Sequence, residues 1–205
     1  MSEAAAVRPP AEPVEYSLTD TLGKLGMWLF LAGDAMGFGG LLAGYGGLRY
    51  GSADWPVPGS TLGIPLTAFM TFVLICSSVT MVKALAAIRH GDRQWMRNFL
   101  LLTMLGGLIF LGLQAYEWTH LMYGKGIWFS GNPYGSPLFG STFFALTGFH
   151  GMHVTGGVIY LGCVVIQGAR GRYSAERYHP VEIAGLYWHF VDLVWILIFT
   201  FVYLI

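Results

Sequence analysis

Apolar residues occur in five long runs along this chain, separated by short connectors rich in glycine, proline and charged residues. A helix rises about 1.5 Å per residue, so about 20 apolar residues cross the ~30 Å hydrocarbon core of a bilayer. The predicted spans cover residues 22–48, 62–88, 99–121, 139–167 and 183–205. The pattern therefore predicts an all-α fold, a polytopic membrane helical bundle of five transmembrane helices.

The first 21 residues lack this apolar character. They contain the following prolines and glutamates: Pro9, Pro10, Pro13, Glu3, Glu12 and Glu15. The stretch has no central apolar segment, so it resembles neither a secretory signal nor a transit peptide. We expect residues 1–21 to form a mobile polar tail, residues 22–205 to form one transmembrane domain, and the chain to lie in a prokaryotic cytoplasmic membrane.

Composition agrees with a membrane location. Of the 205 residues, 55% are hydrophobic and 11% are charged, whereas soluble domains carry about 25% charged residues. The formal net charge is zero, which leaves no basic face for nucleic acid. Cys76 and Cys163 lie within apolar runs and form no CxxC motif, so they are predicted to be packing residues.

The placement of lysine and arginine predicts the orientation of the bundle. With five spans, the N-terminal tail and the connectors near residues 89–97 and 168–180 share one side. That side carries nine basic residues: Arg8, Lys24, Lys83, Arg89, Arg93, Arg97, Arg170, Arg172 and Arg177. The other side carries Arg49 and Lys125. Since cytoplasmic loops are enriched in Lys and Arg, the N-terminus is predicted to be cytoplasmic and the C-terminus outside.

Several ionisable residues fall inside the predicted spans, where a charge costs at least ~2.5–3.5 kcal/mol on insertion scales. They are Asp34, Glu117, His150, His153, His189 and Asp192. Asp34 follows Lys24 by ten residues, which places it roughly 15 Å into the membrane, near the midplane. The pairs His150/His153 and His189/Asp192 are each three residues apart, so each pair shares one helix face. Glu117 lies near the outer end of its span.

Three interpretations of these residues are open. They can link helices through hydrogen bonds. They can bind a metal or haem through His150, His153 and His189, since imidazole is a common ligand, although no HExxH motif or cysteine ligand accompanies them. They can also form a proton-active site, because a carboxyl group in an apolar setting can exchange protons.

Longer motifs in the second half are specific to a family. Thr147-Gly148-Phe149-His150-Gly151-Met152-His153-Val154 and Tyr187-Trp188-His189-Phe190-Val191-Asp192-Leu193-Val194-Trp195 closely resemble the signatures of cytochrome c oxidase subunit III. Further similar segments are Tyr134-Gly135-Ser136, Gly140-Ser141-Thr142-Phe143-Phe144, Leu113-Gln114-Ala115-Tyr116-Glu117-Trp118, Gly91-Asp92-Arg93 and Gly26-Met27-Trp28-Leu29-Phe30. The resemblance covers residues 22–205 and is to the five-helix bacterial form, which lacks the first two of the seven helices often found.

The resemblance implies a non-redox subunit of a proton-pumping haem-copper oxidase in aerobic respiration. Haem and copper then reside in the partner subunits, and this chain binds neither. The implied partners are subunit I as the main contact, subunit II, small subunits and structural phospholipids. The chain is expected to support stable turnover and proton uptake, with cytochrome c as the electron donor. A quinol oxidase subunit III and a nitric oxide reductase accessory subunit are the alternatives within this class.

The resemblance also suggests roles for single residues. Asp34 stands where the family usually has glutamate, and we expect it to be a proton-active carboxyl group paired with His153 or His150. His189, Asp192 and Glu117 are further hydrogen-bonding candidates. The candidates for lipid binding are Arg170, Arg172, Arg177, Glu182 and Trp188. Two different classes remain as rivals: a stand-alone transporter, which would need repeats or broken helices, and a haem-binding membrane anchor.

Overall fold

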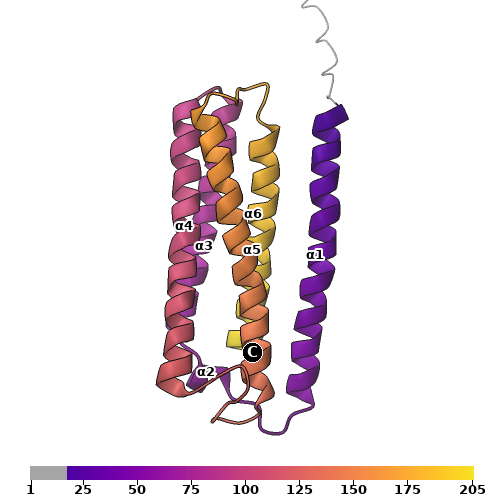
Figure 1. Ribbon diagram of the computed structural model, residues 1–205, viewed down its shortest axis with the longest axis vertical. Helices are drawn as coiled ribbons and strands as arrows, with labels where there is room; N and C mark the ends of the chain where they lie inside the picture. The colour runs from indigo at the N-terminus through magenta and orange to yellow at the C-terminus, as the bar shows by residue number, and fades with distance from the viewer. Residues whose placement is uncertain (1–17) are drawn as a thin grey trace, which may run out of the picture.

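Five long helices make up most of the protein in a computed structural model that describes residues 18–205 (Figure 1). The helices are α1 (Leu18–Tyr50), the short α2 (Pro58–Thr61), α3 (Ile64–Arg89), α4 (Arg93–Thr119), α5 (Leu138–Ala169) and α6 (His179–Ile198). α4 continues into a π-helical turn at His120–Gly124, and α6 into another at Phe199–Leu204. In the described part of the chain, five helices are long and apolar enough to cross a membrane, which confirms the predicted five-span bundle.

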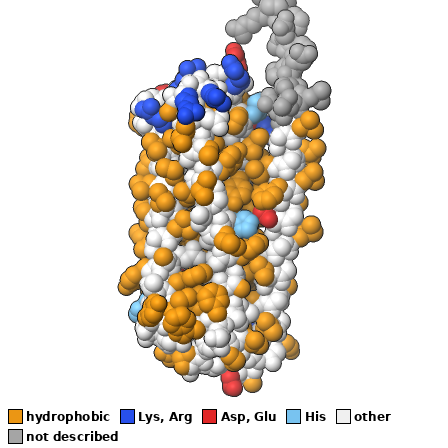
Figure 2. Space-filling view, viewed as in Figure 1, with side chains coloured by type: hydrophobic (Ala, Val, Ile, Leu, Met, Phe, Trp, Pro, Cys, Tyr) orange, Lys and Arg blue, Asp and Glu red, His pale blue; other side chains and the backbone are white. Residues whose placement is uncertain are grey.

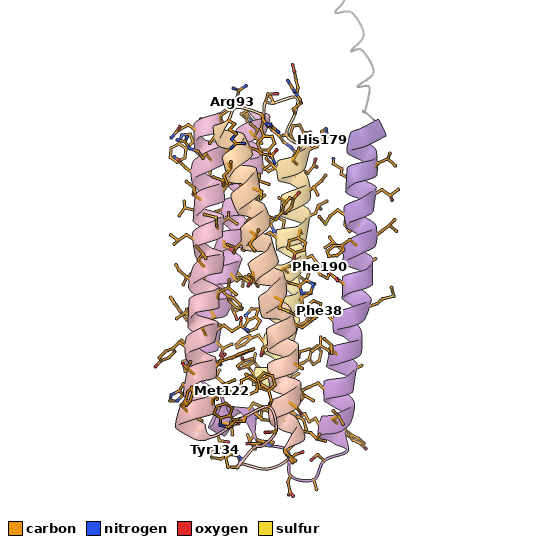
Figure 3. The ribbon with its side chains drawn as sticks, viewed as in Figure 1. Phe38, Arg93, Met122, Tyr134, His179 and Phe190 are labelled. Carbon is orange, nitrogen blue, oxygen red and sulfur yellow. The ribbon has the colours of Figure 1, made fainter. Side chains whose placement is uncertain are left out.

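Helices α3 to α6 form a bundle, and α1 stands at its side (Figure 1). α1 packs mainly on α6 and less on α5. In its most apolar stretch of 18 residues, only 11% of the residues are buried. The corresponding share for the span that contains α6 is 44%. Phe38 and Phe190 lie between α1 and the other helices (Figure 3). Most of the surface of α1 therefore faces away from the bundle.

The third span begins earlier in the structure than in the predicted residues 99–121. α4 starts at Arg93, after a tight turn in which Gly91 has φ of 80°. The Asp92 side chain caps the helix, because its Oδ1 accepts a hydrogen bond of 3.0 Å from the Trp95 amide. The extra turns are polar, so apolar content alone did not reveal them.

Large aromatic side chains fill the bundle interior, and two buried tryptophans form hydrogen bonds between helices. The Trp195 indole N–H donates to the Thr71 hydroxyl at 2.9 Å, and the Trp188 N–H donates to the Ser77 hydroxyl at 3.0 Å. Both tryptophans lie in α6 and both acceptors in α3. These bonds satisfy donors that would be costly to leave unpaired away from water.

Lysine and arginine side chains gather at one end of the molecule, and a largely apolar surface extends from them toward the other end (Figure 2). Arg93 and His179 lie at one end, which carries most of the lysines and arginines and is called the basic end below; Met122 and Tyr134 lie at the opposite end (Figures 2 and 3). This distribution suits a bundle that spans a bilayer. The predicted tail, residues 1–21, falls largely outside the described residues.

Candidate functional site

The structure brings Asp34 of α1 and His153 of α5 together. Asp34 Oδ2 lies 3.2 Å from His153 Nε2, and the two side chains are 18% and 14% exposed. The distance is that of an ion pair, although the alignment falls short of a regular hydrogen bond. Figure 2 shows an acidic and a histidine side chain adjoining each other at mid-height of the apolar surface. This pair is the strongest candidate for chemistry within the membrane.

The hydrogen bond of the imidazole limits the protonation states in which its contact with Asp34 is favourable. His153 Nδ1 lies 2.8 Å from the Phe149 carbonyl oxygen, which can only accept, so Nδ1 carries a hydrogen. In a neutral ring, Nε2 then carries a lone pair that would repel a carboxylate. The contact is favourable when a proton lies between Asp34 and His153, on either group. Both forms have zero net charge, which lowers the cost of placing the pair in hydrocarbon.

Neighbouring side chains from α1 and α6 hold the pair in place. The Tyr187 hydroxyl of α6 donates to the His153 carbonyl oxygen at 2.8 Å. The Phe38 ring, one turn after Asp34, meets the imidazole edge-on with centroids 5.1 Å apart. Phe30 stacks on Tyr187 on the other side of Asp34. The site is thus one of the few places where α1 is anchored to the bundle.

His150 lies apart from Asp34, inside the bundle. It is fully buried, and its Nε2 donates to the Val191 carbonyl oxygen at 3.2 Å. The ring is tilted against Trp195, with centroids 4.9 Å apart. Of the two partners predicted for Asp34, the structure therefore places only His153 beside it.

His189 and Asp192 share a helix face, as predicted, and both turn toward α3. His189 Nδ1 lies 2.7 Å from the Ser78 hydroxyl, and the Asp192 carboxyl group interacts with the same serine. Asp192 is 7% exposed, and its Oδ1 has no hydrogen-bond partner in the described chain. The arrangement links α6 to α3 through one hydroxyl group.

Glu117 is buried more deeply than its place near a helix end suggests. It is 3% exposed and accepts hydrogen bonds of 3.0 Å from the Thr67 hydroxyl of α3 and the Tyr203 hydroxyl. Each carboxyl oxygen thus has one donor. The group joins α3, α4 and the end of the last span.

At the basic end, Glu182 connects basic side chains of three helices. It lies 2.7 Å from Lys24 of α1, 3.2 Å from Arg89 of α3 and 3.5 Å from the His179 ring. The carboxylate is 19% exposed. Its ion pair with Lys24 attaches α1 to the bundle at a second place, and all three of its partners are basic side chains of this chain.

Arg172 and Arg177 line a pocket of about 530 Å³ at the same end, together with Gln167, Tyr173 and Pro180. Gly171 precedes them with φ of 73°, in the left-handed region that favours glycine. Burial raises the pKa of the Tyr173 phenol above its ordinary value. Among the side chains described, those of residues 22–205, no carboxylate forms a salt bridge with either arginine. Arg170 ends α5 nearby without lining the pocket.

Trp188 lies where no lipid can reach it. The residue is 2% exposed, and its ring packs against Gly107 and Gly157 of α4 and α5. The two glycines leave room for the indole between the helices. This position does not fit the predicted contact of Trp188 with lipid.

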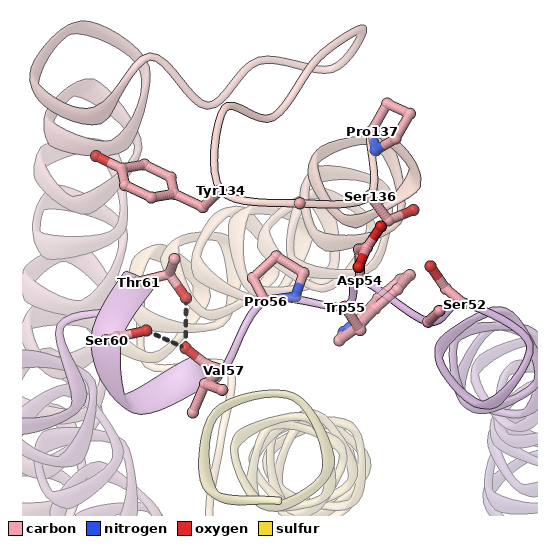
Figure 4. A pocket seen from close by; sticks show the side chains of 12 residues that line it. Ser52, Asp54, Trp55, Pro56, Val57, Ser60, Thr61, Tyr134, Ser136 and Pro137 are labelled. Atoms are coloured by element: carbon pink, nitrogen blue, oxygen red, sulfur yellow. Dashed lines mark hydrogen bonds between the residues drawn. The ribbon is translucent and has the colours of Figure 1, made fainter.

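A wider pocket of about 730 Å³ opens at the end opposite the basic end (Figure 4). The connector before α2 and the segment before α5 form it. The Ser136 amide donates to the Asp54 carbonyl oxygen at 2.8 Å, and the Ser60 and Thr61 hydroxyls donate to the Val57 carbonyl oxygen. Gly135 lies against the Asp54 carbonyl group with φ of 144°, so a side chain there would collide with backbone.

The three candidate histidine ligands do not converge. Among the described side chains, residues 22–205, no group of three or more His, Cys, Asp or Glu is arranged to hold a metal ion. The sequence did not predict the hydrogen bonds of Thr67, Ser78 and Tyr203. A hydroxyl residue within an apolar run does not indicate which side chain of another helix it will contact. Gln114 was also missed, although a polar amide within such a run was a visible sign.

The fold and its intramembrane polar pairs define a multi-pass helical membrane protein. The family model of cytochrome c oxidase subunit III matches residues 17–205. Cytochrome c oxidase subunit 3 of Synechocystis sp. is 39% identical, over 100% of this chain and 84% of the relative. That of Alkalihalophilus pseudofirmus is 34% identical, over 95% and 92%. A probable quinol oxidase subunit 3 of Staphylococcus saprophyticus is 36% identical, over 90% and 89%. The chain belongs to the cytochrome c oxidase subunit III family.

Proposed function

We propose that this chain is the non-redox subunit III of a proton-pumping haem-copper terminal oxidase in a prokaryotic cytoplasmic membrane. It packs on subunit I, with subunit II and small subunits as further partners, and those partners carry the haem and copper. Its N-terminus and basic end face the cytoplasm. The observation that carries the proposal is the contact of 3.2 Å between Asp34 and His153 within the membrane-spanning bundle.

The pair supports proton uptake by exchanging its shared proton. If the proton leaves, Asp34 keeps a negative charge in an apolar setting, so the pair readily takes a proton back. Such a group within the membrane buffers protons during turnover. The same contact also anchors α1, so removing it is expected to shorten the lifetime of the complex. The pair is not proposed to lie on the path of the pumped proton.

Cytochrome c is the proposed electron donor, and quinol is the second candidate. Relatives named as subunits of cytochrome c oxidase and of a probable quinol oxidase have similar identities to this chain, 34–39% and 36%. The donor binds to other subunits. Cytochrome c is proposed because more of the compared relatives are named as cytochrome c oxidase subunits than as quinol oxidase subunits.

Phospholipid is the proposed ligand of the basic end. Arg172 and Arg177 face one pocket, Arg170 lies beside it, and no described carboxylate pairs with these guanidinium groups. Clusters of Lys and Arg next to a cytoplasmic membrane surface attract anionic head groups. Glu182 is already bound to cations of this chain, and Trp188 is buried, so neither is proposed as a lipid ligand.

A mild-detergent purification of the tagged chain tests the proposed function. We expect a large haem-bearing subunit to co-purify in a fixed ratio, with oxygen reduction in the eluate. Adding reduced cytochrome c or a quinol then identifies the donor. A colourless chain without partners would contradict the proposal and would favour the stand-alone transporter.

A further inference from the structure

A second buried carboxyl group, that of Asp192, has no cation beside it. Asp192 lies halfway along the last span, His179–Leu204, and is 7% exposed. The salt bridges among the described side chains, residues 22–205, are made by Asp34 and Glu182 and not by Asp192. Its Oδ1 also has no hydrogen-bond donor in that part of the chain. Because a lone carboxylate at this depth is costly, the carboxyl group is expected to hold a proton.

Ser78 of α3 connects this carboxyl group to an imidazole. The Ser78 hydroxyl lies 2.7 Å from His189 Nδ1, and the Asp192 carboxyl group interacts with the same hydroxyl. A hydroxyl group donates one hydrogen bond and accepts others. Ser78 can therefore accept from Asp192 while it donates to His189, and the three side chains form a continuous series.

The series runs from a buried end to a partly exposed end. Asp192 is buried, whereas Ser78 and His189 are each partly exposed. His189 lines a groove of about 400 Å³ between α1 and α6 and is the only ionisable residue in its wall. Phe190, which lies between these helices in Figure 3, lines the same groove. The imidazole is therefore the end at which protons enter or leave.

Moving one proton along this series leaves the net charge at zero. The Asp192 O–H bond breaks as a new O–H bond forms on Ser78. The hydrogen that Ser78 held before passes to His189 Nδ1, which gives a carboxylate and an imidazolium. The resting form is the neutral acid with the neutral imidazole, because it has no separated charges in an apolar setting.

The other ionisable side chains of the membrane interior near α6 have contacts of their own. Asp34 lies 3.2 Å from His153, and His150 donates to the Val191 carbonyl oxygen. None of them forms a hydrogen bond or salt bridge with Asp192. The series is therefore separate from the site at Asp34.

We propose that Asp192, Ser78 and His189 form a proton relay, in which Asp192 stores a proton and Ser78 passes it to and from His189. The relay is a second proton-exchanging site of this chain. It does not depend on the proposed function, because all three groups belong to this chain, and it is not proposed to lie on the path of the pumped proton.

Infrared spectroscopy of the purified full-length chain tests whether Asp192 stores a proton. A protonated carboxyl group has a C=O stretching band that is distinct from those of a carboxylate and shifts in D2O. We expect Asp192→Asn to remove one such band. Asp54→Asn, at an exposed residue, is the control and should remove none. A spectrum that keeps every such band in Asp192→Asn would overturn the relay, since Asp192 would then be ionised.

The rate at which the Asp192 band shifts after transfer to D2O tests the role of Ser78. Ser78→Ala removes the hydroxyl, and Ser78→Thr keeps one. Exchange should be about 5- to 100-fold slower in Ser78→Ala, as expected when a buried group loses its hydrogen-bonding partner. Ser78→Thr should restore the rate. Equal rates in Ser78→Ala and the unaltered protein would overturn the relay, even if Asp192→Asn fails to fold.

Asp34→Asn tests whether the relay is a site of its own. The variant should remove its own carboxyl signal and leave the Asp192 band and its exchange rate unchanged. Loss of both bands in Asp34→Asn would show a single coupled site and would overturn the separate relay. The proposed function is tested by co-purification with a haem-bearing subunit, so its failure and the failure of the relay are distinguishable.

Discussion

The Trp188 indole of α6 occupies the space beside Gly107 of α4 that a side chain at position 107 would need. A Cβ at Gly107 would lie 2.5 Å from Trp188 Cη2 and 2.8 Å from Val158 Cγ2. Real Cβ atoms do not approach other atoms this closely, and Trp188 cannot retreat because its N–H is bonded to Ser77. The glycine is therefore required for α4, α5 and α6 to meet.

Gly107→Ala should destabilise the protein by about 1–3 kcal/mol, the usual range for overpacking a filled core. The matched control is Gly112→Ala on the same helix, where nothing lies within 4 Å of an added Cβ. The control should be neutral or slightly stabilising, since alanine favours a helix more than glycine. Thermal unfolding in detergent measures both. Equal unfolding temperatures for the two variants would contradict the close packing.

Asp34 should react with a hydrophobic carbodiimide, which modifies protonated carboxyl groups in apolar surroundings. The shared proton supplies the reactive form, and an exposed fraction of 18% gives access from the lipid side. Mass spectrometry of labelled peptides locates the adduct. Asp34→Asn should abolish labelling and Glu117→Gln should leave it intact, because Glu117 is only 3% exposed. Labelling confined to Glu117 would refute the assignment.

The sequence was sufficient to predict the five spans, because a helix that crosses the hydrocarbon core of a bilayer must have a certain length and apolar content. It also indicated Asp34 and His153, since ionisable residues are rare at this depth. It left open whether His150 or His153 faces Asp34. That choice depends on how α5 is rotated about its axis, and hence on contacts such as Trp195 with His150 that arise only when helices pack. Trp188 was misplaced for the same reason: its burial depends on two glycines of other helices.

Tyr203→Phe should lower the free energy of unfolding by about 1–3 kcal/mol, the cost of leaving a buried acceptor unsatisfied. The variant removes the hydroxyl that donates to Glu117 Oε2 and changes little else in a fully buried site. Tyr123→Phe, at a residue 79% exposed, is the control and should have no effect. Chemical unfolding of the purified chain provides the comparison. An unchanged free energy of unfolding for Tyr203→Phe would mean that the hydrogen bond from Tyr203 to Glu117 does not stabilise the protein.

The double variant Arg172→Ala/Arg177→Ala should retain fewer anionic phospholipids per chain than the unaltered protein. The two guanidinium groups face one pocket, and each charge near an anionic surface contributes about 1 kcal/mol. Native mass spectrometry counts the bound lipids. Arg97→Ala is the control, because that residue lies at the same end but outside the pocket, bonded to Gln94. Equal lipid retention in all three proteins would show that the two arginines only help to orient the protein in the membrane.

Fusions to alkaline phosphatase, which is active only outside the cytoplasm, should be active after Ile205 and inactive within the connector between α5 and α6. That connector carries Arg170, Arg172 and Arg177 at the basic end, whereas Arg49 and Lys125 mark the opposite end. Because positive charge resists translocation, the end with more Lys and Arg stays in the cytoplasm. Fusion to a fluorescent protein that folds only in the cytoplasm serves as the reciprocal control and should give the inverse pattern. An inactive fusion after Ile205 together with an active one in the connector would reverse the orientation. The Glu182 cluster and the arginine pocket would then lie outside, and the proposed attraction to the cytoplasmic leaflet would fail with it.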